Sequence, residues 1–524
     1  MRSYVGVTVG PIFDTINDAS SPAALWFASN LFSDLTRRIC KGVSEEASFS
    51  EVRIYSPYYA FDIDLSDGVG KFHDRVIFSA ECFSKEKMDV LLDTVKAETI
   101  DVFPEEFKGE AEKEFLKEYL QIHYVVRSEE QIGNANCVHV LSPYLDALEL
   151  MKSFPKDDSC NPIQKLFMGE KGHRNEYIKK SPLFQRVTAG GQLKGSGDSI
   201  RTIGEIASNS EVKDDKTPLG LKHKHYYAVV SADGDNMGSF LEGLSDDQIT
   251  EFSRTCLAYD KAASDLIGAY GGMTIYAGGD DLLFLAPIMT DESNVFELCT
   301  KIRTQFNTQI TSNTTFCNMG KIPTVSFGIS IQYKKFPLYE ALESSRDLLS
   351  LAKSDGGKKK DDYRKNNMMI ELQKHSGQSI SLLVSDESSK VLQEILSIGN
   401  NASNDAELIH SVLYTLDTFS SLVSVLNNEV RRNAENLTPE RYRQYVTAWE
   451  NFFDNAGQQS AKGYIDEICA KYYDNMVIKE SGISVPSYGL TESDKQENVD
   501  ESLRALLYLL KLKHFLAEKE GDRQ

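Results

Sequence analysis

The feature that most constrains the fold is a GlyGlyAspAsp tetrapeptide at residues 278–281, set between two short apolar runs. The runs at 273–277 and 282–286 have the length and composition of strands, so the segment is predicted to be a hairpin with both acids at its tip. An earlier apolar and aromatic run at 225–232 is predicted to be a buried strand, and Asp233 follows it directly. Any fold of this segment must therefore accommodate several carboxylates at strand ends.

Helical signals complete the order around this hairpin. Ser245 and Gln248 have capping-box spacing and open a helix that is expected to run to Gly271. A second helix is expected from Val295, a fourth strand over 324–333, and a further helix from Pro337 to near Lys353. The order β-α-β-β-α-β is that of ferredoxin-like folds. In that topology the first and third strands are antiparallel neighbours, which predicts that Asp233 lies beside Asp280 and Asp281.

The N-terminal part repeats this order more weakly, which suggests an internal duplication. Its expected strands include Tyr4–Val9 and His123–Arg127, with a helix opened by Ser21-Pro22. The predicted class is therefore α+β: two ferredoxin-like domains, a loop-rich connector and a helical C-terminal domain that starts after about residue 376. The predicted domains are 1–127, 128–220, 221–377 and 378–524.

Composition limits the functions that such a chain can have. With 57 Lys and Arg against 78 Asp and Glu, its formal charge of −21 argues against a protein that coats naked nucleic acid by itself. Its eight Cys include no CxxC pair, which disfavours a zinc knuckle. No apolar run approaches the roughly 20 residues that span a bilayer, so a cytoplasmic protein without membrane contact is expected.

The three aspartates are the strongest chemical signal. Asp233, Asp280 and Asp281 could hold two Mg²⁺ (or Mn²⁺) ions, which would activate an attacking hydroxyl and stabilise a leaving pyrophosphate. Gly278 and Gly279 would allow a tight turn and close approach of a nucleotide.

Four further signals are weaker. Asp235 is equally compatible with a metal ligand and with a simple turn. Lys353 is the preferred contact for a triphosphate, whereas Lys359 and Lys360 are interpreted as a solvated loop. The His73-Asp74 pair lacks further ligands nearby and is interpreted as structural.

These motifs resemble those of a known family. SerAlaAspGlyAspAsnMetGly at 231–238, TyrAlaGlyGlyAspAspLeuLeu at 276–283 and LeuAlaLys at 351–353 are similar to the large, polymerase-like subunit of type III CRISPR effector complexes, specifically the Cmr class of type III-B. Further similar segments extend the resemblance from residue 4 to about residue 377.

The resemblance implies two palm-like domains, of which the second is active. It implies partners as well, namely other Cmr subunits, guide crRNA and target RNA. In that family the palm is switched on by target RNA and converts ATP into cyclic oligoadenylate. By this resemblance Asp233, Asp280 and Asp281 are the metal-binding acids, Gly278 and Gly279 the nucleotide-approach glycines, and Lys353 the triphosphate contact.

The sequence departs from the family pattern in two places. The palm-like strand already starts at Tyr4, which puts the N-terminal HD nuclease of many relatives in doubt. Relatives often hold zinc with four Cys between the palms, whereas Cys137 and Cys160 alone make that site unlikely.

Three alternative functions remain open. The first alternative is transfer of AMP from ATP to S-adenosylmethionine. The second is a stand-alone GGDEF-like cyclase, disfavoured by Asp281 in place of Glu. The third is a non-catalytic scaffold subunit, which the repelling acids argue against.

Overall fold

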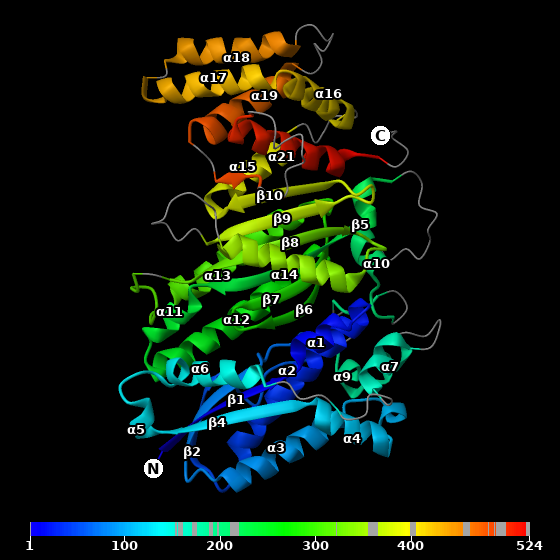
Figure 1. Cartoon of the computed structure of the whole chain (residues 1–524), viewed down its shortest axis with the longest axis vertical. Helices are drawn as coiled ribbons and strands as arrows, with labels where there is room; N and C mark the ends of the chain where they lie inside the picture. Colours follow the sequence, from blue (N-terminus) through cyan, green and yellow to red (C-terminus); the bar gives the residue numbers. More distant parts are fainter. Residues whose placement is uncertain are drawn as a thin grey trace.

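The computed structural model describes residues 2–519, apart from 152–154, 156–160, 170–174, 188–191, 196–198, 210–219, 321, 355–364, 399–404, 437, 454–461, 480–481, 487 and 489–498. Two β-sheets with their helices are stacked along the long axis, and a layer of C-terminal helices lies beyond the second sheet (Figure 1). Much of the glycine-rich segment from residue 188 and both Lys359 and Lys360 fall outside the described residues.

The N-terminal domain has the expected ferredoxin-like order. Its four strands pair in the order β2-β3-β1-β4, with β1 antiparallel to both neighbours. Ser21 caps the long helix α2, whose buried face covers the sheet. The elements are β1 (Arg2–Gly10), α1 (Ile12–Asn17), α2 (Pro22–Glu45), β2 (Ser50–Ser56), β3 (Arg75–Glu81), α3 (Lys85–Ile100), α4 (Glu110–Tyr119) and β4 (Gln121–Ser128).

The second domain repeats this order and extends it. Strand β5 lies between β7 and β8 in a sheet ordered β11-β10-β9-β8-β5-β7-β6. The Ser245–Gln248 capping box is present, and Gly271 ends the same helix in a left-handed conformation. The elements are β5 (Tyr226–Asp235), α11 (Met237–Glu242), α12 (Asp246–Tyr270), β6 (Met273–Gly278), β7 (Asp281–Pro287), α13 (Val295–Ser312), β8 (Thr324–Tyr333), α14 (Leu338–Ser354), β9 (Asn367–Gln373), β10 (Ser379–Ser385) and β11 (Ile483–Ser484).

The expectation of helix from about residue 376 is wrong at its start. Strand β10 occupies Ser379–Ser385, where it pairs with β9 and continues the second sheet past residue 377. The helical part of this domain is also interrupted at Phe419. The C-terminal helices are α15 (Ser389–Ser397), α16 (Asp405–Thr418), α17 (Ser420–Asn433), α18 (Pro439–Phe453), α19 (Lys462–Lys471) and α21 (Glu501–Ala517).

The segment expected to be loop-rich contains several helices. Helix α6 is capped by Asn136 and packs on β1, with Leu141 and Leu145 fully buried. The helices of this segment are α5 (Glu129–Ile132), α6 (Cys137–Glu149), α7 (Pro162–Met168), α8 (Glu176–Lys180), α9 (Pro182–Gln185) and α10 (Ile203–Ser208).

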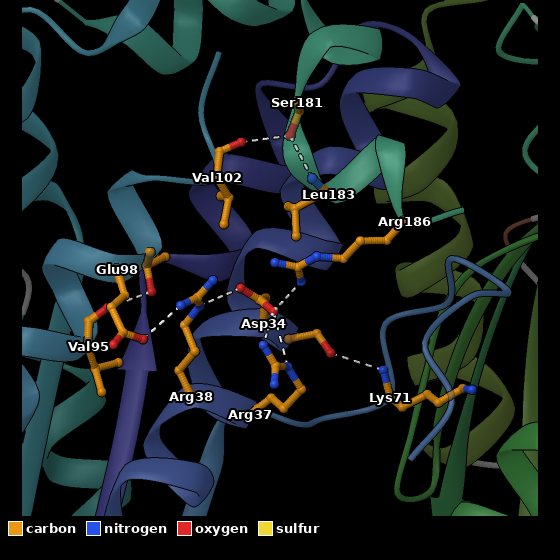
Figure 2. Close-up of polar contacts among 12 residues, drawn as sticks. Asp34, Arg37, Arg38, Lys71, Val95, Glu98, Val102, Ser181, Leu183 and Arg186 are labelled. Carbon is orange, nitrogen blue, oxygen red and sulfur yellow. Dashed lines mark hydrogen bonds and ion pairs between the residues drawn. The ribbon is translucent and has the colours of Figure 1, made fainter. Parts of the chain in front are cut away.

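A buried carboxylate ties this segment to the first domain. Asp34 on α2 is 6% exposed and accepts hydrogen bonds from Arg37 Nη2 at 2.7 Å, Arg38 Nε at 2.6 Å and Arg186 Nη1 at 3.0 Å (Figure 2). Burial alone would raise the pKa of Asp34, but the guanidinium groups of Arg37 and Arg38 hold that pKa below its usual range. The ion pairs therefore fix the position of Arg186, which directly follows α9, against the core of the first domain.

The first domain also contacts the edge of the second sheet directly. The amide of Ala277 on β6 donates to the carbonyl of Gly70 at 2.9 Å, and Ser29 Oγ on α2 donates to the carbonyl of Ile275 at 3.1 Å. The loop between β2 and β3 thus lies along the edge strand of the second sheet, next to the GlyGlyAspAsp turn. The first domain therefore contributes to the surroundings of that turn.

No single helix of the described residues is long and apolar enough to cross a membrane. Helices α16 and α17 meet the length and composition requirement only when taken together, and they are bent by 79° at their junction.

Candidate active site

The GlyGlyAspAsp segment forms the predicted tight turn between β6 and β7. Gly278 pairs with Asp281 across the hairpin, and Gly279 has φ of +79°, a conformation that strongly favours glycine. An added Cβ at Gly278 would come within 2.5 Å of the Tyr276 hydroxyl. Both glycines are therefore required by the turn, which places the two acids one after the other at its tip and at the start of β7.

Antiparallel pairing brings the third aspartate to the same place. Ala232 is opposite Leu282, so Asp233 lies beside the start of β7. The approach is close, because an added Cβ at Gly234 would lie 2.6 Å from Asp280 Oδ2. The structure thus brings Asp233, Asp280 and Asp281 together.

Lys353 is the cation of this cluster. It forms an ion pair with Asp233, and its Nζ also donates to the carbonyl of Gly234 at 2.8 Å. The lysine comes from the last turn of α14, which packs over β5 and β8. The structure therefore places Lys353 within the acidic cluster, while its expected contact with a triphosphate stays a prediction.

The electrostatics of the cluster are dominated by repulsion. Burial, followed by the charge of Asp233, raises the pKa of Asp280 to about 7. Asp281 is exposed and lines the cavity described below. Desolvation by the nearby protein and the charges of Asp280 and Asp233 raise the pKa of Asp281 well above its usual range. Among the described residues, the ammonium group of Lys353 is paired with this cluster, and it leaves the three carboxylates undercompensated.

The carboxylates suit a divalent cation, although the observed arrangement is not itself a ligand set. Across the part of the chain that the structure describes, no three Asp, Glu, His or Cys side chains stand in metal-binding geometry. The ammonium of Lys353 instead holds Asp233. Oxygen donors and excess negative charge are what Mg²⁺ prefers, so Asp233, Asp280 and Asp281 fit such an ion if Lys353 moves off Asp233.

Asp235 belongs to a different environment. It is fully buried, and its carboxylate accepts hydrogen bonds from Thr324 Oγ1 at 2.7 Å, Ser326 Oγ at 2.9 Å and the amide of Asn366 at 2.8 Å. These bonds join β5 to β8 and to the residue before β9. They satisfy the carboxylate, and they favour a structural role for Asp235 over metal binding.

A cavity of about 370 Å³ opens beside the three aspartates. Asp233 and Asp281 line it together with Arg346 of α14. Phe13, Asp14, Asp74 and His123 of the first domain and Glu149 of α6 complete the lining on the other side of the domain boundary. Arg346 donates to Asn17 Oδ1 at 2.8 Å and lies 5.2 Å from the ring centre of Phe13. A small molecule in this cavity would therefore touch both domains.

His73 and Asp74 are near the site without forming a metal centre. His73 is hydrogen-bonded to Ser56 at 2.9 Å, and burial lowers its pKa to about 4. Burial, followed by the charge of Glu149, raises the pKa of Asp74 to about 6. The geometry favours the structural interpretation of His73, but Asp74 faces the cavity, which the sequence did not reveal.

Sequence reasoning also missed Asp260 on α12. Its Oδ2 accepts a hydrogen bond from the amide of Gly279 at 3.2 Å, and its side chain is 1% exposed. The signal was present, because Asp260 lies beside the buried stripe formed by Cys256, Tyr259 and Ala263. An acidic side chain beside the buried face of a helix indicates a specific hydrogen-bond partner inside the protein.

The sheet order and the acids at the hairpin tip define the palm class of ferredoxin-like domains. Residues 226–362 match the family model described as "Cas10/Cmr2, second palm domain". The second domain is therefore similar to the Cas10/Cmr2 palm domains, and the resemblance to the type III-B large subunit expected from the sequence is confirmed.

One curated relative and two solved structures extend this comparison. The chain is 27% identical over 259 residues to "CRISPR system Cmr subunit Cmr2" of Pyrococcus furiosus, an alignment that covers 42% of this chain and only 27% of the relative. A type III-B Cmr-beta structure in the apo state matches with TM-score 0.55 and 11% identity, covering 98% of this chain and 82% of that one. A Csm1–Csm4 cassette in complex with cA4 matches with TM-score 0.53 and 12% identity, covering 99% and 70%. These structures share the fold.

Proposed function

We propose that this chain is the large subunit of a type III-B CRISPR ribonucleoprotein and that its second palm is a nucleotidyltransferase that converts ATP into cyclic oligoadenylate when target RNA is bound. The observation that carries the proposal is the convergence of Asp233, Asp280 and Asp281 beside a cavity shared by both domains. The Csm1–Csm4 relative was solved with a cyclic oligoadenylate, cA4, which supports the product class.

The arrangement suits attack of one nucleotide on another. A new bond forms between the 3′-oxygen of one ATP and the α-phosphorus of the second, the α–β phosphoanhydride bond breaks, and pyrophosphate leaves. Bound Mg²⁺ ions would lower the pKa of the attacking hydroxyl and neutralise the leaving group. Asp233, Asp280 and Asp281 would hold these ions, while Gly278 and Gly279 let the nucleotide approach the backbone. Positioning and charge neutralisation then supply most of the rate.

In this scheme Lys353 contacts the triphosphate of ATP, and its position supports that role. Its ammonium pairs with Asp233 and reaches the carbonyl of Gly234. An incoming triphosphate is a stronger partner for a lysine than one carboxylate, since it carries several negative charges. Lys353 therefore transfers from Asp233 to the triphosphate, which frees Asp233 for the metal ion.

The partners follow from the same proposal. Other Cmr-type subunits would carry the guide crRNA, and target RNA would pair with that guide in the cytoplasm. The chain has a net charge of −21, so most of its contact with RNA would occur through the assembled complex.

The test is product analysis on the assembled, target-bound complex. The double variant Asp280→Ala, Asp281→Ala is expected to abolish oligoadenylate formation from ATP while the complex still assembles. A matched control is Asp246→Ala, Asp247→Ala, which removes two acids at the start of α12. Product formation by the Asp280/Asp281 variant at the normal rate would refute the assignment, and no ATP turnover by the wild-type complex would favour a scaffold.

One observation favours a second candidate, transfer of AMP from ATP to S-adenosylmethionine. The part of the cavity formed by the first domain and α6 carries Asp14, Asp74 and Glu149, and none of its described lining residues is Lys or Arg. Arg75 contacts Glu149 from beside the cavity and offsets part of this charge. An acidic acceptor wall repels a second triphosphate and suits an acceptor with a sulfonium and an ammonium group.

Mass spectrometry distinguishes the two acceptors. The complex is incubated with ATP, with and without S-adenosylmethionine, and the products are identified. An adduct of AMP with S-adenosylmethionine supports the second candidate. Oligoadenylate alone under both conditions eliminates it.

A further inference from the structure

Asp260 is a buried acid directly behind the GlyGlyAspAsp turn. It lies on α12, which packs against β6, and its side chain is 1% exposed. It does not line the cavity beside the three aspartates, so it cannot contact a ligand there. Its nearest polar partner is the turn itself.

The hydrogen bonding of Asp260 is incomplete for a buried carboxyl group. Oδ2 accepts from the amide of Gly279 at 3.2 Å, whereas Oδ1 is buried without a hydrogen-bond partner among the described residues. Burying a carboxyl group with one oxygen unsatisfied lowers stability, and an apolar side chain of similar size would avoid that cost. A benefit other than stability therefore accounts for an acid at this position.

The contact acts on the glycine pair of the turn. Gly278 and Gly279 are consecutive, and Gly279 already has positive φ, so several backbone conformations are accessible to this pair. The amide of Ala277 is held by the carbonyl of Gly70, and the amide of Gly279 is held by Asp260. Together these bonds fix the peptide planes that lead into Asp280.

We propose that Asp260 is a positioning residue of the nucleotidyl transfer site: by accepting the Gly279 N–H it holds the turn so that Asp280 and Asp281 face Asp233. This inference rests on the proposed function of the second palm. Small displacements of reacting groups lower rates strongly, so loss of this acceptor reduces turnover rather than nucleotide binding.

The test compares Asp260→Leu, which removes the acceptor, with Asp260→Asn, which keeps an oxygen acceptor. Asp265→Asn, at an exposed position of the same helix, is the matched control. Each variant is studied in the assembled, target-bound complex by steady-state kinetics with ATP and by thermal unfolding. Hydrogen exchange of the peptide containing Gly279 gives a readout that does not depend on activity.

We expect Asp260→Leu to lower kcat at least tenfold with KM for ATP within about twofold and with unchanged or higher thermal stability. Exchange at Gly279 is faster in that variant, while Asp260→Asn and Asp265→Asn retain kcat within about threefold. Normal kcat or normal exchange in Asp260→Leu overturns the inference. The inference is also overturned if kcat of Asp260→Asn falls as far as kcat of Asp260→Leu while hydrogen exchange at Gly279 in Asp260→Asn stays normal.

The same experiment separates this inference from the proposed function. If the wild-type complex transfers no nucleotide to any acceptor, the proposed function fails. The hydrogen exchange of Gly279 then still decides whether Asp260 holds the turn.

Discussion

Replacing Asp280 with Asn is predicted to stabilise the metal-free protein while removing its activity. Burial and the charge of Asp233 raise the pKa of Asp280 to about 7, from an ordinary value of 3.8. Such a shift corresponds to about 4 kcal/mol, at about 1.36 kcal/mol per unit. Asp280 is only partly buried and lies near Lys353, which weakens this repulsion, so we expect a gain of about 1–2 kcal/mol.

The pH dependence of that gain follows from the sign of the shift. Between about pH 4 and pH 7 the folded wild-type protein holds a proton on Asp280 that the unfolded chain has lost, so wild-type stability falls as pH rises through this range. Asn does not titrate. The advantage of Asp280→Asn therefore grows from pH 4 to pH 7 and is constant above pH 7.

The assay is thermal unfolding in a chelating buffer at pH 5 and pH 8, repeated at pH 8 with Mg²⁺ and a non-hydrolysable ATP analogue. A gain of 1–2 kcal/mol raises the melting temperature by roughly 2–8 °C. Ligand is expected to stabilise the wild type more than the variant, because the variant lacks one carboxylate for the ion. Equal or lower stability of Asp280→Asn at pH 8 without metal, or a gain as large at pH 5 as at pH 8, would refute the reasoning.

Two further predictions concern single residues. Lys353→Met is expected to raise KM for ATP about tenfold, equivalent to about 1.4 kcal/mol, because the substitution removes the cation beside Asp233. An unchanged KM for ATP in steady-state kinetics would contradict the role assigned to Lys353. Asp34→Ala leaves three guanidinium groups without their shared carboxylate and is expected to lower the free energy of unfolding by about 3–5 kcal/mol. Because the pKa of Asp34 is depressed, its contribution is present above about pH 4 and lost as pH falls below it, so denaturant unfolding at pH 7 and pH 3 should show a shrinking difference between wild type and variant.

The parts of the fold that were predictable are those with local signals. The Ser245–Gln248 capping box, the glycines of the turn and the alternating strand of the first domain each specify structure within a few residues. The convergence of Asp233 with Asp280 followed from topology, because the ferredoxin-like order fixes which strands are neighbours.

Features that depend on contacts between distant segments were missed. Strand β10 is recognisable only because β9 pairs with it, and β9 is placed by a parallel contact with β8. The acidic wall formed by Asp74 and Glu149 appears only when α6 packs on the first sheet and brings Glu149 to the cavity. Local periodicity carries no information on such long-range pairings.

The most direct test of the central claim is a crystal structure of the protein with Mn²⁺ and a non-hydrolysable ATP analogue, with the metal located by its anomalous scattering. The account predicts Mn²⁺ bound directly by Asp233 and at least one of Asp280 and Asp281, with Lys353 moved from Asp233 to the triphosphate. Nucleotide bound in the cavity with no Mn²⁺ on these carboxylates, or Lys353 still paired with Asp233, would contradict it.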